Sequence, residues 1–176
     1  SLRRQRQMCI RDSGVGVLLV PLRHPLMLAK SLATLDIASN GRLDTGVGIG
    51  AYEPDYSSTG TPFKTRGRMY DEALEVITRL WTEDSVTHNG EFYQLEDISL
   101  QPKPTQKPHP PIWVPGSRST STLTEVAKRG YCYFLSSRSH GGETYKAREQ
   151  FSEVLEKHGD SYQPYRMGIL LSLIHI

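Results

Sequence analysis

The chain is short of cysteine, of long apolar runs and of net charge, and each shortage excludes a class of protein. Two cysteines in 176 residues are too few for the disulfide framework of a small secreted domain. No apolar run approaches the roughly 20 residues of a membrane-spanning helix, and Arg3, Arg4 and Arg6 precede no signal-peptide core. A formal net charge of +2 gives no broad positive field for nucleic acid. We therefore expect a cytoplasmic, globular protein that acts on a small molecule, with no nucleic-acid partner and no membrane.

The two ends of the chain are related through one short DNA sequence. Residues 8–13 can be encoded by ATGTGTATAAGAGACAG, and the reverse complement of that sequence encodes Leu-Ser-Leu-Ile-His-Ile, which is residues 171–176. A library adapter joined in opposite orientations to both ends of an insert would give this pair. We therefore expect residues 1–13 and 171–176 to be translated adapter and not native sequence. The alternative is a basic arm at one end and an apolar strand at the other.

Without those ends the composition changes. Residues 14–170 carry 17 basic and 18 acidic side chains, and therefore a net charge of −1, because four arginines and Asp12 leave the count. Cys132 is then the one remaining thiol, and the histidines do not recur at a metal-ligand spacing, so we expect no metal site. We also expect residues 14–170 to be an internal part of a longer protein with an incomplete core, and hence to be unstable or prone to aggregation alone.

Residues 14–170 alternate between apolar runs typical of buried strands and segments with helical periodicity. This alternation favours parallel strands joined by helical crossovers, but periodicity does not distinguish a closed barrel from an open doubly wound sheet. The aromatic residues Tyr131, Tyr133 and Phe134 are expected in the core. The predicted strands are 14–20, 43–49, 112–114, 131–136 and 165–170, and the predicted helices are 25 to about 39, 67–81, about 121–129 and 143–158.

Two further segments have recognisable local signals. Residues 86–88 and Phe92-Tyr93 flank Asn89-Gly90, a pair that favours the positive φ angles of a tight two-residue hairpin turn, and we expect this hairpin outside the main sheet. Five prolines between Pro102 and Pro111 predict an extended surface connection.

Ligands of such folds bind beyond the carboxyl ends of the parallel strands, so the residues that follow each strand are candidates. The run from Gly46 to Ala51 can be read as the G-x-G-x-x-A of a dinucleotide-binding fingerprint. That fingerprint requires an apolar helix next, which Tyr52-Glu53-Pro54-Asp55-Tyr56 does not begin. A strand end that needs small residues for packing is the other reading.

The turn from Pro115 to Thr122 is rich in hydroxyl groups, contains Arg118 and leads into a helix. Free N–H groups at a helix start, hydroxyls and an arginine can all bind a phosphate. Ordinary helix capping by Ser119, Ser121 or Thr122 explains the same residues without a ligand. His24, beside Pro25, is expected to be a loop or cap residue and not a base. We identify no catalytic residue from spacing.

The order of several short motifs resembles the bacterial luciferase-like monooxygenase family over essentially all of residues 14–170. These motifs are Val20-Pro21-Leu22-Arg23-His24-Pro25, Leu35-Asp36, Asn40-Gly41-Arg42, Gly46-Val47-Gly48-Ile49-Gly50, Arg79-Leu80-Trp81-Thr82, Phe92-Tyr93, Pro102-Lys103-Pro104, Lys107-Pro108, Pro110-Pro111-Ile112-Trp113-Val114 and Lys128-Arg129-Gly130. The resemblance implies an α/β fold, a partial (β/α)8 TIM barrel that runs from about strand 3 through the start of strand 7.

The resemblance also implies a function. Such proteins use reduced flavin mononucleotide (FMN), or a deazaflavin in some members, and many use O2 to oxidise a small organic substrate. A flavin reductase partner and a homodimer of the intact parent are expected with it. The family's catalytic histidine follows strands that are absent here, so the catalytic residues stay unknown. The alternatives are a deazaflavin-dependent hydride-transfer oxidoreductase, a catalytically silent flavin-binding barrel and a nicotinamide-binding open sheet.

Residue by residue, the family pattern places the flavin ring against Gly16 and Val17, where several members have a non-proline cis peptide. Gly48 and Gly50, with the Ala51-Tyr52 turn, would approach the ring or its ribityl tail. The phosphate would meet Gly116, Ser117 and the polar residues that follow them as far as Thr122, including Arg118 and Ser119. In luciferases proper an arginine after the Asp-aromatic pair also holds phosphate, whereas Asp55-Tyr56 is followed here by Ser57.

Overall fold

A computed structural model describes residues 13–116, 119–135, 141–159 and 167–169, and it divides the chain into two compact units. The first unit is Ser1–Pro110 and the second is Pro111–Ile176. Ser117, Arg118 and the expected adapter segments, apart from Ser13, lie outside the described residues. No described helix has both the length and the apolar character that a membrane crossing requires.

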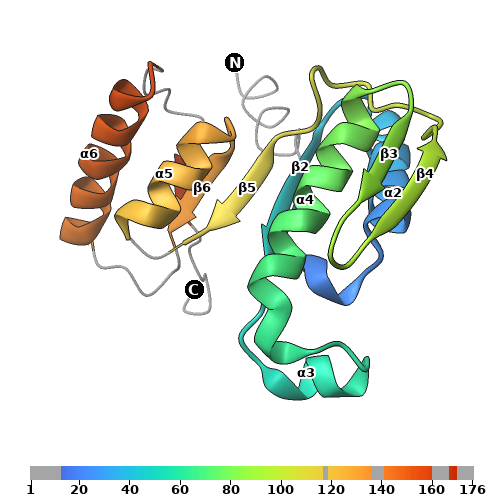
Figure 1. The fold of residues 1–176 in the computed structure, drawn as a ribbon. Helices are drawn as coiled ribbons and strands as arrows, with labels where there is room; N and C mark the ends of the chain where they lie inside the picture. The colour runs from blue at the N-terminus through green and yellow to red at the C-terminus, as the bar shows by residue number, and fades with distance from the viewer. Residues whose placement is uncertain (1–12, 117–118, 136–140, 160–166, 170–176) are drawn as a thin grey trace, which may run out of the picture. The chain divides into compact units, whose positions relative to one another are not determined.

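The first unit is built on two parallel strands, β1 (Ser13–Leu19) and β2 (Leu43–Gly48), joined by the crossover helix α2 (Pro25–Ala38) (Figure 1). A short 3-10 turn, η1 (Val20–Leu22), follows β1. Pro25 is the first helical residue, where its missing N–H costs nothing, and His24 caps the helix by accepting a hydrogen bond at Nδ1 from the Leu26 N–H (3.3 Å). The predicted stop is confirmed, because Asn40 and Gly41 have φ angles of 56° and 71°.

The helix predicted over residues 67–81 is confirmed as α4 (Arg66–Thr82), which follows α3 (Glu53–Ser58) and η2 (Phe63–Thr65). Its buried side chains repeat at helical spacing and pack on α2, and the indole N–H of Trp81 donates to the carbonyl of Ala29 (3.0 Å). The buried set of α4 is Ala73, Leu74, Val76, Ile77, Leu80 and Trp81.

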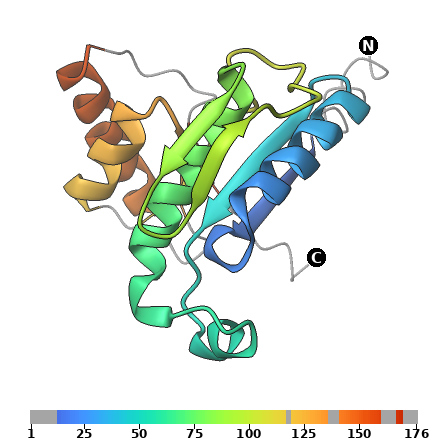
Figure 2. The same ribbon diagram turned by 45° about the vertical axis from the view of Figure 1, so that its right-hand side comes forward.

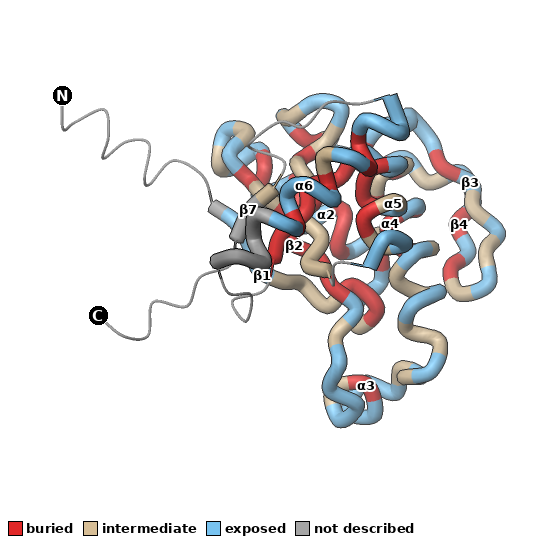
Figure 3. Tube along the Cα trace, turned by 90° about the vertical axis from the view of Figure 1, so that its left-hand side faces the viewer, coloured by how far each residue is buried: buried red, intermediate tan, exposed pale blue. Residues whose placement is uncertain are grey.

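The hairpin is confirmed as a separate two-stranded sheet of β3 (Val86–Asn89) and β4 (Gln94–Ile98), which lies along α4 (Figure 2). One residue of each strand is buried, and the others are half-buried or exposed (Figure 3). The prediction of a tight two-residue turn at Asn89-Gly90 is wrong, because Asn89 pairs with Gln94 and the loop spans residues 90–93. Phe92-Tyr93 therefore lies in the loop and not in a strand. The reason is tertiary: the carboxylate of Glu72 binds the loop's N–H groups.

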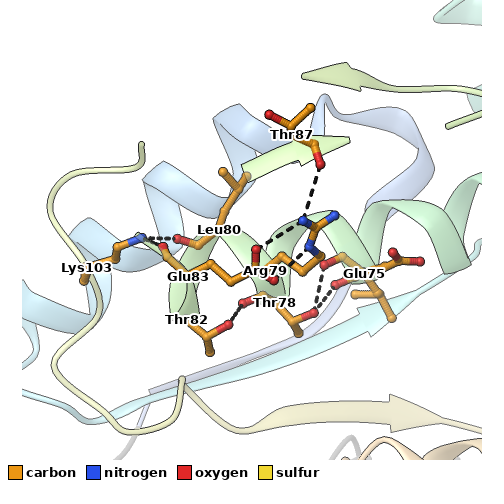
Figure 4. Close-up of polar contacts among 9 residues, drawn as sticks. Glu75, Thr78, Arg79, Leu80, Thr82, Glu83, Thr87 and Lys103 are labelled. Carbon is orange, nitrogen blue, oxygen red and sulfur yellow. Dashed lines mark hydrogen bonds and ion pairs between the residues drawn. The ribbon is translucent and has the colours of Figure 1, made fainter. Parts of the chain in front are cut away.

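The proline-rich connection contains no helix or strand between β4 and residue 112, but its backbone bends at residues 101–102 and 105–110 and is not extended throughout as expected. Two of its residues attach it to helices α2 and α4 of the first unit. The ammonium group of Lys103 donates to the carbonyls of Leu80 (2.8 Å) and Glu83 at the end of α4, beside the Arg79–Glu83 ion pair (Figure 4). Gln106 donates its backbone N–H (2.9 Å) and its side-chain amide (2.8 Å) to the fully buried carboxylate of Asp36.

The second unit has three parallel strands, β5 (Ile112–Pro115), β6 (Cys132–Leu135) and β7 (Met167–Ile169), with helices α5 (Thr120–Lys128) and α6 (Gly141–Lys157). The parallel pairing with helical crossovers is thus confirmed within each unit. Tyr131, Tyr133 and Phe134 are buried as expected. The helical spacing of residues 143–158 places His158 on the core side with Val154, but His158 is exposed, because α6 ends at Lys157 and His158 bonds back to the Val154 carbonyl.

Candidate functional site

The first predicted site residues, Gly16 and Val17, lie in the middle of β1, which continues to Leu19. The peptide bond between Gly16 and Val17 is cis, as the resemblance led us to expect, and the register with β2 shifts between Val15 and Leu18. Gly16 is exposed, and a Cβ built on it would have no atom of another described residue within 4 Å, its two chain neighbours apart. The backbone at Gly16 is therefore open to the approach of a flat ligand from the side where a side chain would stand.

The glycines in β2 and just after it are required for different physical reasons. A Cβ on Gly46 would collide with the carbonyl oxygen of Val15, so this residue is a glycine because two strands approach closely. Strand packing, one of the two readings of this run, thus explains Gly46. Gly48 pairs with Leu19 at the end of the ladder, and Gly50 has a φ angle of 69°, which favours glycine.

Two side chains of the turn after β2 are exposed to solvent, and a buried residue of the next helix, Tyr56, hydrogen-bonds to the backbone of the turn. Ile49 and Tyr52 are 41% and 66% exposed, while Tyr56 of α3 is fully buried. The hydroxyl of Tyr56 donates to the carbonyl of Ile49. A short helix therefore does follow Gly50, but Tyr56 is its one buried residue, so it is not the apolar helix of a dinucleotide-binding fold.

An aromatic group of η2 and a cationic group at the start of α4 support Tyr56. Its ring contacts that of Phe63 edge-on, with 5.2 Å between the centroids. The guanidinium of Arg66 stacks on Phe63 at 3.7 Å and donates to the carbonyl of the same residue (2.8 Å). Sequence reasoning did not assign a role to Tyr56, because the pairing of its hydroxyl with a carbonyl seven residues earlier leaves no periodic signal.

The second unit carries the predicted phosphate contacts at the start of α5. Ser119 is the N-cap, and its hydroxyl accepts from the Thr122 N–H (3.3 Å), so the capping interpretation is confirmed for Ser119. The N–H groups of Thr120 and Ser121 have no acceptor within the helix, which suits an anionic ligand. A Cβ on Gly116 would lie 2.8 Å from Thr122 Cγ2 and 3.0 Å from the Tyr133 ring, so packing requires this glycine.

A partly buried carboxylate, that of Glu72, fixes the hairpin loop to α4 in the first unit. Glu72 accepts hydrogen bonds from the N–H groups of Phe92 (3.1 Å) and Tyr93 (2.9 Å) and contacts Nε2 of His88 (3.1 Å). Burial is the largest influence and raises the pKa of Glu72, but the hydrogen bonds from Tyr93, His88 and Phe92 and the charge of His88 outweigh it and lower the pKa below its ordinary 4.5. A Cβ on Gly90 would collide with this carboxylate and with His88.

The structure therefore groups the predicted site residues in two sets. Gly16 and Val17 lie on the strand beside that of Gly48, with Gly50 just after it, all in the first unit. Gly116 and Ser119 flank the start of α5 in the second unit. Within the residues that the structure describes, no cluster of three or more His, Cys, Asp or Glu is suited to a metal ion. His24 is a helix cap, as expected, and not a candidate base.

These features define an α/β protein in which each unit carries parallel strands and helical crossovers. Comparison with known proteins identifies the family more closely. The family described as luciferase-like monooxygenase matches residues 13–175, and the chain belongs to that family. The prediction of a partial (β/α)8 barrel is thereby confirmed over the open nicotinamide-binding sheet.

Individual relatives agree with this assignment. The oxygenase component of the flavin-dependent trigonelline monooxygenase of Acinetobacter baylyi is 36% identical over 155 residues, which cover 86% of this chain and 42% of that protein. The FMNH(2)-dependent dimethylsulfone monooxygenase of Pseudomonas putida is 34% identical over 148 residues, which cover 82% of this chain and 39% of that protein. The crystal structure of the monooxygenase RslO1 from Streptomyces bottropensis superimposes with a TM-score of 0.83 at 26% identity and covers 90% of this chain and 48% of its own. The chain thus spans less than half the length of the curated relatives it matches.

Proposed function

We propose that the chain is part of a monooxygenase that uses reduced FMN and O2 to oxidise a small organic substrate. Family membership supports this proposal, and the open backbone at Gly16 is the observation in the chain that carries it. A flat ring can lie against a backbone only where no side chain projects, and Gly16 lies beside the strand that ends at Gly48. Bound flavin would supply the electron-transfer and oxygen chemistry, and the protein would position and shield it.

Each unit contributes residues of suitable chemistry to this proposal. In the first unit, Gly16, Val17, Gly48 and Gly50 are the proposed contacts for the ring and its tail. In the second unit, Gly116 and Ser119, together with Ser117 and Arg118, are the proposed contacts for the phosphate. The exposed N–H groups at the start of a nine-residue helix, α5, fit an anion there. No residue of the chain is proposed as the catalytic base.

The proposal extends to partners. The trigonelline relative is described as an oxygenase component, which supports a separate flavin reductase as the source of reduced FMN for the full-length protein. We further propose that the full-length protein is a homodimer.

The test is a titration of the full-length protein that contains this chain with reduced FMN and with a reduced deazaflavin, followed by absorbance with and without O2. FMN binding with an oxygen-dependent absorbance change supports the monooxygenase. Binding of the deazaflavin alone would replace it with a hydride-transfer oxidoreductase, and FMN binding without reaction towards O2 would indicate a silent flavin-binding barrel.

A pair of glycine variants locates the site. Gly16→Val places a branched side chain on the open side of the Gly16 backbone, where a Cβ meets no described residue beyond its chain neighbours, so it should weaken FMN binding at least tenfold, which corresponds to about 1.4 kcal/mol. Gly67→Val is the matched control, since a Cβ there also meets nothing, on the first turn of α4. A bulky residue at Gly48 should weaken binding too. Unchanged affinity in Gly16→Val or in the Gly48 variant would remove that residue from the site.

A further inference from the structure

One buried hydroxyl holds the backbone of the turn that follows β2. Tyr56 is 0% exposed, and its hydroxyl donates to the carbonyl of Ile49, which lies between Gly48 and Gly50. The turn has few anchors of its own, because the side chains of Ile49 and Tyr52 are exposed to solvent. The orientation of the peptide between Ile49 and Gly50 therefore depends on a residue of the next helix.

The ring of Tyr56 also contacts the turn directly. A Cβ built on Gly50 would lie 3.2 Å from Leu19 Cδ2 and 3.4 Å from Tyr56 Cε2. The backbone of Gly50 thus lies between the end of β1 and the Tyr56 ring. Movement of that ring would change the position of the turn relative to both strands.

Tyr56 is itself held by groups from three consecutive segments. The N–H of Thr61 donates to the Tyr56 carbonyl (2.9 Å), Phe63 of η2 packs edge-on against its ring, and Arg66 at the start of α4 stacks on Phe63. These contacts form a continuous series from the first turn of a 17-residue helix to the turn after β2. The hydroxyl stays a donor at neutral pH, because burial raises the pKa of Tyr56, Arg66 lowers it less, and Asp55 raises it further.

From this geometry we infer that Tyr56 is a positioning residue for the cofactor-binding turn, acting through its hydrogen bond to the Ile49 carbonyl. This inference rests on the proposed function, in which Gly48 and Gly50 approach the flavin. A residue that merely filled the core would need the ring and not the hydroxyl, so Tyr56→Phe separates the two roles. Loss of one hydrogen bond in this place should weaken the affinity for reduced FMN about fivefold to tenfold.

The experiment compares three forms of the full-length protein: wild type, Tyr56→Phe and Tyr93→Phe. Tyr93 is the matched control, because it is also buried but its hydroxyl has no hydrogen-bond partner among the described residues. The dissociation constant of reduced FMN is measured well below the melting temperature, and the visible circular dichroism of bound oxidised FMN reports the setting of the ring. The expected result is weaker binding and an altered flavin spectrum in Tyr56→Phe, with both unchanged in Tyr93→Phe.

The possible results distinguish a failure of this inference from a failure of the proposed function. If the wild type binds no flavin, the proposed function fails. If the wild type binds FMN and Tyr56→Phe matches it in affinity and spectrum, Tyr56 is a core residue and the inference is overturned. If Tyr56→Phe does not fold, 3-fluorotyrosine at position 56 takes its place, since it keeps the ring and makes the hydroxyl a stronger donor to the Ile49 carbonyl. Wild-type FMN affinity and spectrum with 3-fluorotyrosine would likewise overturn the inference.

Discussion

Removal of the Glu72 carboxylate should detach the hairpin loop from α4. The side chain is 13% exposed and accepts hydrogen bonds from the N–H groups of Phe92 and Tyr93 while contacting His88. In Glu72→Ala these two backbone donors lose their acceptor. An unpaired buried donor costs about 1–3 kcal/mol, and Phe92 is half-buried, so water replaces part of the loss. We expect a decrease of about 2–4 kcal/mol in the free energy of unfolding.

The conservative variant Glu72→Gln keeps one acceptor oxygen but loses the charge, and we expect about half the effect, or about 1–2 kcal/mol. Urea unfolding at pH 7, followed by circular dichroism, measures both variants. Glu75→Ala is the control, since Glu75 lies exposed on the same helix, and its effect should stay within about 0.5 kcal/mol. An effect of Glu72→Ala no larger than that of Glu75→Ala would refute the reasoning.

The pH dependence gives a second check of the same prediction. The pKa of Glu72 is lower in the folded protein than its ordinary 4.5, so the unfolded chain takes up a proton more readily as the pH falls. The stabilisation by Glu72 is therefore fully present above about pH 4.5 and is lost as the pH falls through the folded pKa. The difference in unfolding free energy between wild type and Glu72→Gln should shrink below pH 4.5. A difference that stays constant from pH 7 to pH 3 would show that the charge of Glu72 is not its cause.

Two further perturbations test other anchors of the fold. Asp36→Ala should lower the free energy of unfolding by about 3 kcal/mol, because it leaves the N–H groups of Gln106 without their buried acceptor. Urea unfolding of a double-mutant cycle with Gln106→Ala measures the interaction. Strictly additive losses in that cycle would contradict the pairing of Asp36 with Gln106. Ser119→Ala should cost about 1 kcal/mol through loss of the α5 N-cap. In Ser119→Ala, the amides in the first turn of α5 should exchange hydrogen faster than in the wild type. Unchanged protection of these amides would argue against a capping role of Ser119.

The elements that sequence analysis located are those fixed by local chemistry. Pro25 and Asn40-Gly41 mark the ends of α2 because they act on their own backbone, and the apolar spacing of α4 needs no knowledge of its neighbours. The hairpin turn was wrong for the opposite reason. Its conformation depends on Glu72, which is 18 residues from Gly90 in the chain and contributes a carboxylate that no local rule anticipates.

The site shows the same division. The motif around Gly46, Gly48 and Gly50 was visible as a glycine pattern with strand packing as one of its two readings, but the pattern did not assign the packing to Gly46 or the positive φ angle to Gly50. Tyr56 was visible only as half of an Asp-aromatic pair. Its contact with the Ile49 carbonyl depends on how α3 folds back on the turn, and a single sequence does not specify that path.

The anchors of the proline-rich connection set a rule for how homologous chains can vary in length. Lys103 donates hydrogen bonds at the end of α4, and three residues later Gln106 donates hydrogen bonds to Asp36 near the end of α2. An insertion in the hairpin loop lies upstream of both anchor residues and leaves the spacing between them unchanged. One residue added between Lys103 and Gln106 would instead pull one of them from its acceptor. Relatives should therefore tolerate insertions and deletions at the hairpin tip while keeping the three-residue interval between these anchors constant.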